Sequence, residues 1–113
     1  MSQSRVTTFT LTIPSGQTTS NVARAWETYG NSAGLIIQSP ATLPETVTIQ
    51  VSNDNGVSWA ALQDGSPLAD VTTPGAGKAA VYDRLAIAQQ FRLVAGAAVG
   101  GNRVFSISFS SLY

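Results

Sequence analysis

The feature that most constrains the fold is the two-residue alternation of apolar and hydroxyl side chains near both ends of the chain. In residues 103–110, RVFSISFS, phenylalanine and isoleucine alternate with serine. In residues 6–13, VTTFTLTI, apolar residues alternate with threonine. Such a pattern is typical of a strand with one buried and one exposed face. The side chains expected to point inward are Phe9, Leu11, Ile13, Phe105, Ile107 and Phe109, while Val104 falls on the serine face.

Six further segments, bounded by turn residues, are expected to be strands: residues 18–26, 33–39, 46–52, 57–61, 78–82 and 90–95. In the first of them, Val22 and Trp26 are expected to point inward. In the second, Leu35-Ile36-Ile37 is a continuous apolar run, which predicts a strand covered on both faces. In residues 46–52 and 90–95, the expected inward side chains are Val47, Ile49, Val51, Phe91, Leu93 and Ala95.

These segments amount to about eight short strands at intervals of ~8–15 residues, and no segment has a convincing helical pattern. The pattern predicts an all-β fold, an antiparallel β-sandwich of the jelly-roll or Ig-like type. A chain of 113 residues is long enough for one core and too short for two, so we expect residues 1–113 to form a single domain. Because the first and last strands both carry one apolar and one hydroxyl face, we expect them to be neighbours in one sheet.

The stretch SNDNGVSW matches the Asp-box pattern Ser-x-Asp-x-Gly-x-x-Trp, with Ser52, Asp54, Gly56 and Trp59 at the defining positions. Asn55 and Gly56 tolerate the positive φ of a tight hairpin, so the box predicts a turn between two strands. Asp54 is expected to accept hydrogen bonds from N–H groups of this turn, and Trp59 to anchor the hairpin by burial. Asp boxes are best known from sialidase propellers, but a propeller needs at least about four blades and the chain has one box. We therefore expect a structural turn rather than a site.

Residues 64–77, DGSPLADVTTPGAG, have the composition of a long loop, which is expected to be functional or mobile. The loop holds apolar side chains that gain little by facing water, and residues 1–5 are expected to form a flexible arm. The expected contacts with a partner are Arg5, Pro67, Leu68, Val71 and Pro74.

The composition argues against the common catalytic and metal sites. The chain has no histidine and no cysteine, which removes Ser–His–Asp triads and the nitrogen and sulfur ligands of zinc. Glycoside hydrolysis needs two carboxylates at a set separation, and no pair among the six carboxylates suggests itself. Asp64 and Asp70 are candidates for a calcium site, but their spacing matches no cation-loop motif. We therefore expect no enzymatic activity, no cofactor and no metal.

Charged residues make up only 11% of the chain, against about 25% in a typical soluble domain. Six basic residues balance six acidic ones, and the basic residues form no cluster. Binding to nucleic acid or to an anionic membrane requires a basic surface, so neither partner is expected. A surface with so little charge is poorly protected against self-association, and we expect a homo-oligomer, either a dimer or a trimer.

The hairpin VTIQVSNDNGVSWAALQD, the Gly/Pro-rich loop after it, the segment AVYDRLAIAQQFRLVAG and the final strand RVFSISFS resemble small all-β structural proteins of tailed bacteriophages. The resemblance covers roughly residues 45–110. It implies a jelly-roll or Ig-like fold, no catalysis, and a protein that decorates or cements the capsid by binding across the joints between major capsid subunits. The implied partners are the major capsid protein or other virion proteins, and the implied location is the capsid surface of the virion.

Two further observations bear on location and on the alternative function. The first residues, MSQSRVTTFT, lack the apolar segment of a signal peptide, and the chain has no cysteine, so we expect synthesis and folding in the host cytoplasm. A further hypothesis for the function is a β-domain unrelated to phages, such as a subunit of another assembly. The second hypothesis is a carbohydrate- or host-surface-binding module of a phage tail or fibre. It rests on the Asp box and on an aromatic platform for sugar rings, which would be formed by Trp26, Tyr29, Trp59, Tyr82 and Tyr113.

Overall fold

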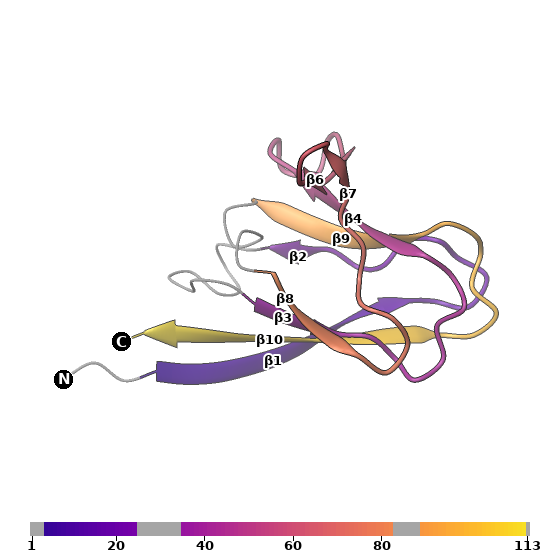
Figure 1. The fold of residues 1–113 in the computed structure, drawn as a ribbon, viewed down its shortest axis with the longest axis horizontal. Helices are drawn as coiled ribbons and strands as arrows, with labels where there is room; N and C mark the ends of the chain where they lie inside the picture. Colours follow the sequence, from indigo (N-terminus) through magenta and orange to yellow (C-terminus); the bar gives the residue numbers. More distant parts are fainter. Residues whose placement is uncertain (1–3, 25–34, 83–88, 113) are drawn as a thin grey trace.

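The computed structural model describes residues 4–24, 35–82 and 89–112, and every regular element in this part of the chain is a β-strand (Figure 1). The strands are β1 (Ser4–Ile13), β2 (Ala23–Arg24), β3 (Leu35–Gln38), β4 (Val47–Ser52), β5 (Ala60–Ala61), β6 (Gln63–Asp64), β7 (Ala69–Asp70), β8 (Ala79–Tyr82), β9 (Gln90–Ala95) and β10 (Arg103–Leu112). They form two four-stranded sheets, β1-β10-β3-β8 and β2-β9-β4-β5, and a two-stranded pair, β6-β7. All the pairings are antiparallel, which confirms the expected fold class. None of the described segments forms a helix that could span a bilayer.

The order of pairing identifies the sandwich as a jelly roll. β1 pairs with β10, β2 with β9, β3 with β8 and β4 with β5, so the chain is folded back on itself around the loop between β4 and β5. Successive pairs belong alternately to the two sheets, as happens when one long antiparallel ribbon is wrapped into a sandwich. Of the two sandwich types expected from the sequence, the strand order is therefore that of the jelly roll. β6 and β7 form a hairpin added between β5 and β8.

β1 and β10 form the longest ladder of the described strands. Their register runs from Ser4 opposite Leu112 to Ile13 opposite Arg103. In the described part of the chain, β3 pairs with residues 106–109 of β10, so the ends of β1 and β10 nearest the chain termini extend beyond β3 (Figure 1). The expectation that the first and last strands are neighbours is confirmed. Two strands with the same one-sided pattern bury both apolar faces together when they pair in register.

The core lies between the two sheets and consists largely of the side chains that the alternation assigned to it. Phe9 is half-buried at the edge of the core and meets Phe109 edge to face, with ring centroids 6.1 Å apart. Val104, on the opposite face of β10, is 46% exposed. The buried apolar residues are Leu11, Ile13, Ala23, Leu35, Ile37, Val47, Ile49, Phe91, Leu93, Ala95, Val99, Phe105, Ile107 and Phe109.

The segment before β2 differs from its expected register. Val22 is 41% exposed and Ala23 is buried, so the prediction that Val22 points inward is wrong. Ser20 explains the shift, because its N–H donates to the Leu93 carbonyl and its hydroxyl accepts from the Leu93 N–H, both at 2.9 Å. These bonds attach the segment to β9 ahead of the strand, and a shift of one residue exchanges the two faces. Trp26 lies outside the described residues.

β3 is covered on one face only. Leu35 and Ile37 are buried, but Ile36 between them is 43% exposed, so the prediction of cover on both faces is wrong. β3 lies between β10 and β8 in one layer of a two-layer sandwich, and alternate side chains of such a strand point away from the core. The apolar run therefore leaves one isoleucine on the outer face of the sheet.

Residues 64–77, expected to form a long loop, contain a hairpin and a segment, residues 71–73, that pairs with the second sheet. They include most of the β6–β7 hairpin, which projects from the sandwich (Figure 1). After the hairpin, the Val71 N–H donates to the Leu62 carbonyl at 2.8 Å, and the Val71 carbonyl accepts from the Ile49 N–H at 3.1 Å. The Thr73 N–H donates to the Val47 carbonyl at 2.9 Å, so this segment continues along the edge of β4 beyond β5.

Candidate functional site

The Asp box forms the loop between β4 and β5, at the closed end of the folded ribbon. The Ser52 hydroxyl donates to one carboxylate oxygen of Asp54 at 2.8 Å and accepts from the Gly56 N–H at 2.9 Å. The same Asp54 oxygen accepts from the Ser58 N–H at 2.9 Å, and the other accepts from the Ser58 hydroxyl. These bonds, chiefly the one from the Ser58 hydroxyl, lower the pKa of Asp54 from 3.8 to about 2. The carboxylate is thus engaged within its own loop, as a turn-forming aspartate would be.

Two glutamines at the start of β9 hold the tip of this loop. Asn55 has a positive φ of 61°, its N–H donates to the Gln89 side-chain oxygen at 2.8 Å, and its own side-chain oxygen accepts from Gln90 at 3.2 Å. Gly56 has a φ of 85°, and a Cβ there would lie 3.0 Å from the Gln90 side-chain oxygen. Glycine therefore satisfies both the backbone conformation and the close approach. Sequence reasoning missed this contact because the glutamines are 34 and 35 residues away from Asn55 in the sequence.

Trp59 packs on the outer face of the second sheet instead of filling the core. Its ring is half-buried, and the Arg92 guanidinium carbon lies 4.2 Å from the ring centroid. Arg92 is held in turn by Gln50, whose side-chain oxygen accepts from Nε at 2.9 Å. The expectation that residues 57–61 form the returning strand is also wrong at its start, because Val57 is 85% exposed and β5 begins at Ala60. The loop spans residues 53–59, which is longer than a tight turn and leaves these side chains outside the ladder.

The aromatic residues of the proposed sugar platform are not gathered within the described part of the chain. Trp59 follows β4 in one sheet, and Arg92 covers one face of its ring. Tyr82 ends β8 in the other sheet, where its hydroxyl donates to the Thr72 carbonyl at 2.6 Å and burial raises its pKa. Trp26, Tyr29 and Tyr113 lie outside the described residues.

The residues expected to contact a partner fall into two groups. Pro67 and Leu68 are exposed between β6 and β7, at the tip of the projecting hairpin, where Leu68 is 67% exposed. Val71 packs against the core, and the Pro74 carbonyl accepts from the Ser39 hydroxyl at 2.6 Å, so both contribute to the domain itself. Arg5 lies in β1, and its side chain is outside the described part.

The two aspartates considered for calcium have contacts within the hairpin. Asp64 accepts from the Gly65 N–H at 2.8 Å, and Asp70 accepts from the Gln63 side-chain amide at 3.0 Å. Within residues 4–24, 35–82 and 89–112, no group of three or more acidic, histidine or cysteine side chains could hold a metal ion.

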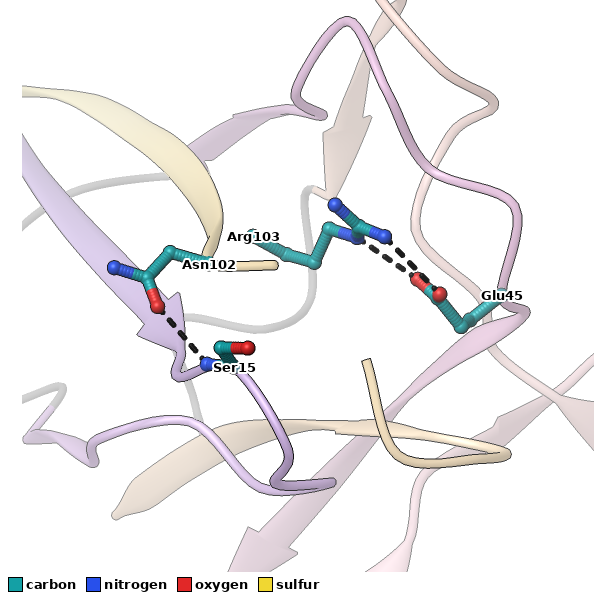
Figure 2. A network of polar contacts seen from close by, with 4 residues as sticks. All are labelled: Ser15, Glu45, Asn102 and Arg103. Atoms are coloured by element: carbon teal, nitrogen blue, oxygen red, sulfur yellow. Dashed lines mark hydrogen bonds and ion pairs between the residues drawn. The ribbon is translucent and has the colours of Figure 1, made fainter. Parts of the chain in front are cut away.

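A partly buried ion pair joins the first residue of β10 to the segment before β4 (Figure 2). Arg103 donates to the two carboxylate oxygens of Glu45, from Nε at 3.0 Å and from Nη2 at 3.3 Å. Next to it, the Asn102 side-chain oxygen accepts from the Ser15 N–H at 2.9 Å. The hydrogen bond from Arg103 lowers the pKa of Glu45. Sequence reasoning missed this pair because its partners are 58 residues apart and meet only in the folded chain.

The outer face of the first sheet carries no charged side chains in its described part. Ile36 and Val81, which are 43% and 70% exposed, are cross-strand neighbours on β3 and β8. The Thr8 and Ser108 hydroxyls, on β1 and β10, are 3.1 Å apart in the same row across the sheet. We name this surface the uncharged face. It consists of Thr8, Thr10, Thr12, Ile36, Gln38, Ala79, Val81, Val104, Ser106 and Ser108.

No family model and no curated protein matches the chain. Among solved structures, the SPBc2 prophage-derived protein YomS is 14% identical, with a TM-score of 0.66 over 96% of each chain. This similarity shows a common fold, which includes nearly the whole of both chains. The Yersinia pseudotuberculosis-derived mitogen is 12% identical, with a TM-score of 0.45 over 95% of this chain and 86% of its own. The second similarity is too weak to indicate a common fold.

Proposed function

We propose that this jelly-roll domain is a non-enzymatic structural protein of a tailed-phage virion, which decorates the capsid by binding across the joints between major capsid subunits. The observation that carries the proposal is the uncharged face, where Ile36 and Val81 form an exposed apolar pair among hydroxyl side chains. The likeness in fold to the prophage-derived protein YomS, over 96% of each chain, supports a phage origin. The resemblance of residues 45–110 to phage structural proteins supports the same origin.

The chemistry of the uncharged face suits binding to another protein. Burying exposed apolar side chains contributes about 25 cal/mol per Å² before the costs of association. Hydroxyl groups cost far less to remove from water than charges do, and threonine and serine can find new partners across an interface. A sheet face can also lie over a joint and contact two subunits together, and many copies on one shell multiply modest contacts.

The β6–β7 hairpin supplies a second, smaller contact in this proposal. Leu68 is 67% exposed at the tip of a hairpin that projects from the sandwich, with Pro67 beside it (Figure 1). A projecting tip can enter a depression on a neighbouring subunit that a flat sheet cannot reach. Of the loop residues considered as contacts, Pro67 and Leu68 are exposed, whereas Val71 and Pro74 are half-buried.

The test compares lysine at three exposed aliphatic positions. Val81→Lys should abolish or strongly weaken binding to capsids that lack the protein, because an unpaired ammonium buried in an interface is costly. Leu68→Lys should weaken binding less. Val57→Lys is the matched control, since Val57 is 85% exposed in the Asp-box loop and belongs to neither contact, and it should bind like the wild type. Melting curves show whether all three variants are folded.

Capsids with and without the wild-type protein are then challenged by heat, and their images are compared. The proposal expects density over the joints between major capsid subunits and survival to a higher temperature when the protein is present. Equal survival, equal binding by the Val81 and Val57 variants, or a location at the tail tip would overturn it. A tail-tip location would instead favour the carbohydrate- or host-surface-binding hypothesis.

A further inference from the structure

β1 is the exception among the edge strands of this fold. Among the described residues, the two main sheets end in β1 and β8, and in β2 and β5. In this part of the chain, β2 and β5 have two residues each and β8 has four, while β1 has ten. Natural sheets protect their edges with short strands, lysine, proline or bulges. β1 is long and has neither proline nor lysine, and its register with β10 is unbroken.

The backbone groups at the free edge of β1 can be identified from two hydrogen bonds. The Thr12 N–H donates to the Asn21 side-chain oxygen at 2.8 Å, so it points away from β10. The Thr8 and Ser108 hydroxyls meet at 3.1 Å, as side chains do in the closely spaced pairs that exchange no backbone bonds. Because the pattern alternates along a strand, the N–H and C=O groups of Thr8 and Thr10 also point to the free edge. In the described part of the chain, no residue bonds to these groups of Thr8 and Thr10.

We propose that this edge binds the β1 strand of a second copy of the chain, antiparallel and about a two-fold axis, so that two first sheets join into one continuous sheet. A row of unpaired backbone groups is complementary to another strand. Self-pairing suits β1 because residues 6–13 carry no charge, and two copies therefore bring no like charges together. A two-fold contact between identical surfaces is also the commonest form of a closed homo-oligomer.

Phe9 gives a second reason for a partner at this edge. It is half-buried, whereas Leu11 and Ile13, further along the same face of β1, are fully buried. A strand added beside β1 would place its own core-facing side chains next to Phe9 and cover the rest of the ring. The proposal does not depend on capsid binding, because the added strand extends the uncharged face without covering it.

Amide hydrogen exchange tests the proposal on the unaltered protein. In the dimer, the Thr8 and Thr10 amides should exchange at least about tenfold more slowly than in the monomer, because a paired amide exchanges only when the pairing opens. Their protection should therefore rise with protein concentration. The Thr12 amide is the internal reference, since Asn21 already accepts its hydrogen bond, and its exchange should change little.

A matched pair of variants tests the same contact by light scattering. Thr8→Pro removes the outward N–H, a change that an edge strand tolerates when that N–H faces solvent. Thr8→Val removes the hydroxyl that meets Ser108, as proline does, but keeps the N–H. Wild type and Thr8→Val should have about twice the chain mass of 11.7 kDa, and Thr8→Pro should have the monomer mass.

Three results would overturn the proposal. The first is a wild-type monomer at all concentrations with unprotected Thr8 and Thr10 amides. The second is an oligomer that persists with these amides unprotected, which would mean association through another surface. The third is protection that develops only when capsid protein is added, which would mean that the edge binds a different virion protein. Because the exchange measurement needs no variant, the proposal stays testable if Thr8→Pro fails to fold.

Discussion

The Asp54 carboxylate accepts hydrogen bonds from both the N–H and the hydroxyl of Ser58, and the two residues together close the innermost hairpin of the jelly roll. Every other strand pair of the folded ribbon joins segments that are further apart in the sequence. The Asp box thus lies where the chain turns back on itself. A short polar motif that is best known from sialidase propellers here forms the loop at which the chain reverses direction.

Acid should lower the free energy of unfolding, because the Asp54 carboxylate loses its hydrogen-bonded ionised form when it is protonated. The pKa of this carboxyl is about 2 in the folded protein and 3.8 in its ordinary state. Above about pH 4 it is ionised in both states and its stabilisation is complete. As the pH falls from about 4 to about 2, the unfolded chain takes up the proton first and the stabilisation is lost. Urea unfolding at constant ionic strength should show this decline.

Two variants, Asp54→Asn and Glu45→Gln, show how much of the acid-induced loss of stability comes from each carboxyl group. Asp54→Asn should lower stability at neutral pH and flatten the curve between about pH 4 and 2, because it removes the titrating group. The pKa of Glu45 is also lowered in the folded protein, so this carboxyl adds its own part to the loss of stability in acid. Glu45→Gln should remove that part and keep the part that comes from Asp54. An unchanged acid profile in Asp54→Asn would contradict the role given to the carboxylate.

Gly56→Ala and Gly16→Ala form a matched pair. Both glycines have a positive φ, 85° and 81°, so alanine should cost about 1–2 kcal/mol of unfolding free energy at either position. Only at Gly56 would the new Cβ also meet the Gln90 side chain, whereas nothing lies within 4 Å at Gly16. We expect the Gly56 variant to be less stable than the Gly16 variant by chemical denaturation. Equal losses would show that Gln90 moves aside without cost.

Ile37→Ala and Ile36→Ala test which face of β3 is buried. Ile37 is fully buried, so its truncation should cost about 2–5 kcal/mol. Ile36 is 43% exposed on the uncharged face, and its truncation should cost under about 1 kcal/mol. The same chemical change at adjacent positions makes each variant the control for the other. Similar losses in urea unfolding would indicate that a second layer covers β3.

A double-mutant cycle measures the contact between Trp59 and Arg92. Because the tryptophan is half-buried, Trp59→Ala should cost about 1–3 kcal/mol, less than the loss of a buried aromatic residue. The coupling with Arg92→Ala should be about 0.5–1 kcal/mol, the usual strength of a partly exposed cation–π contact. Val57→Ala, in the same loop but 85% exposed, should change stability by under about 0.5 kcal/mol. Zero coupling would mean that the two side chains stack without a net interaction.

The candidate surfaces were predictable from the sequence only in part. The hydroxyl face of β1 and β10 follows from alternation, and Leu68 was a candidate contact because it is an apolar residue among turn residues. Ile36 was expected to be buried, so its pairing with Val81 on the uncharged face became visible only in the sheet. The free edge of β1 depends on which strand ends the sheet, and this is a property of topology.

The sequence by itself determined the fold class, the inward faces of β1, β4, β9 and β10, and the turn at Asp54. These features depend on a strand's two-residue period and on local turn chemistry, which act over a few residues. The tertiary structure alone decided the register around Ser20, the exposure of Ile36 and the meeting of Glu45 with Arg103. A side chain's face and partners in a sheet depend on pairing with distant strands, and a shift of one residue exchanges the faces. Local pattern therefore specifies that a strand forms, and long-range packing specifies what the strand contacts.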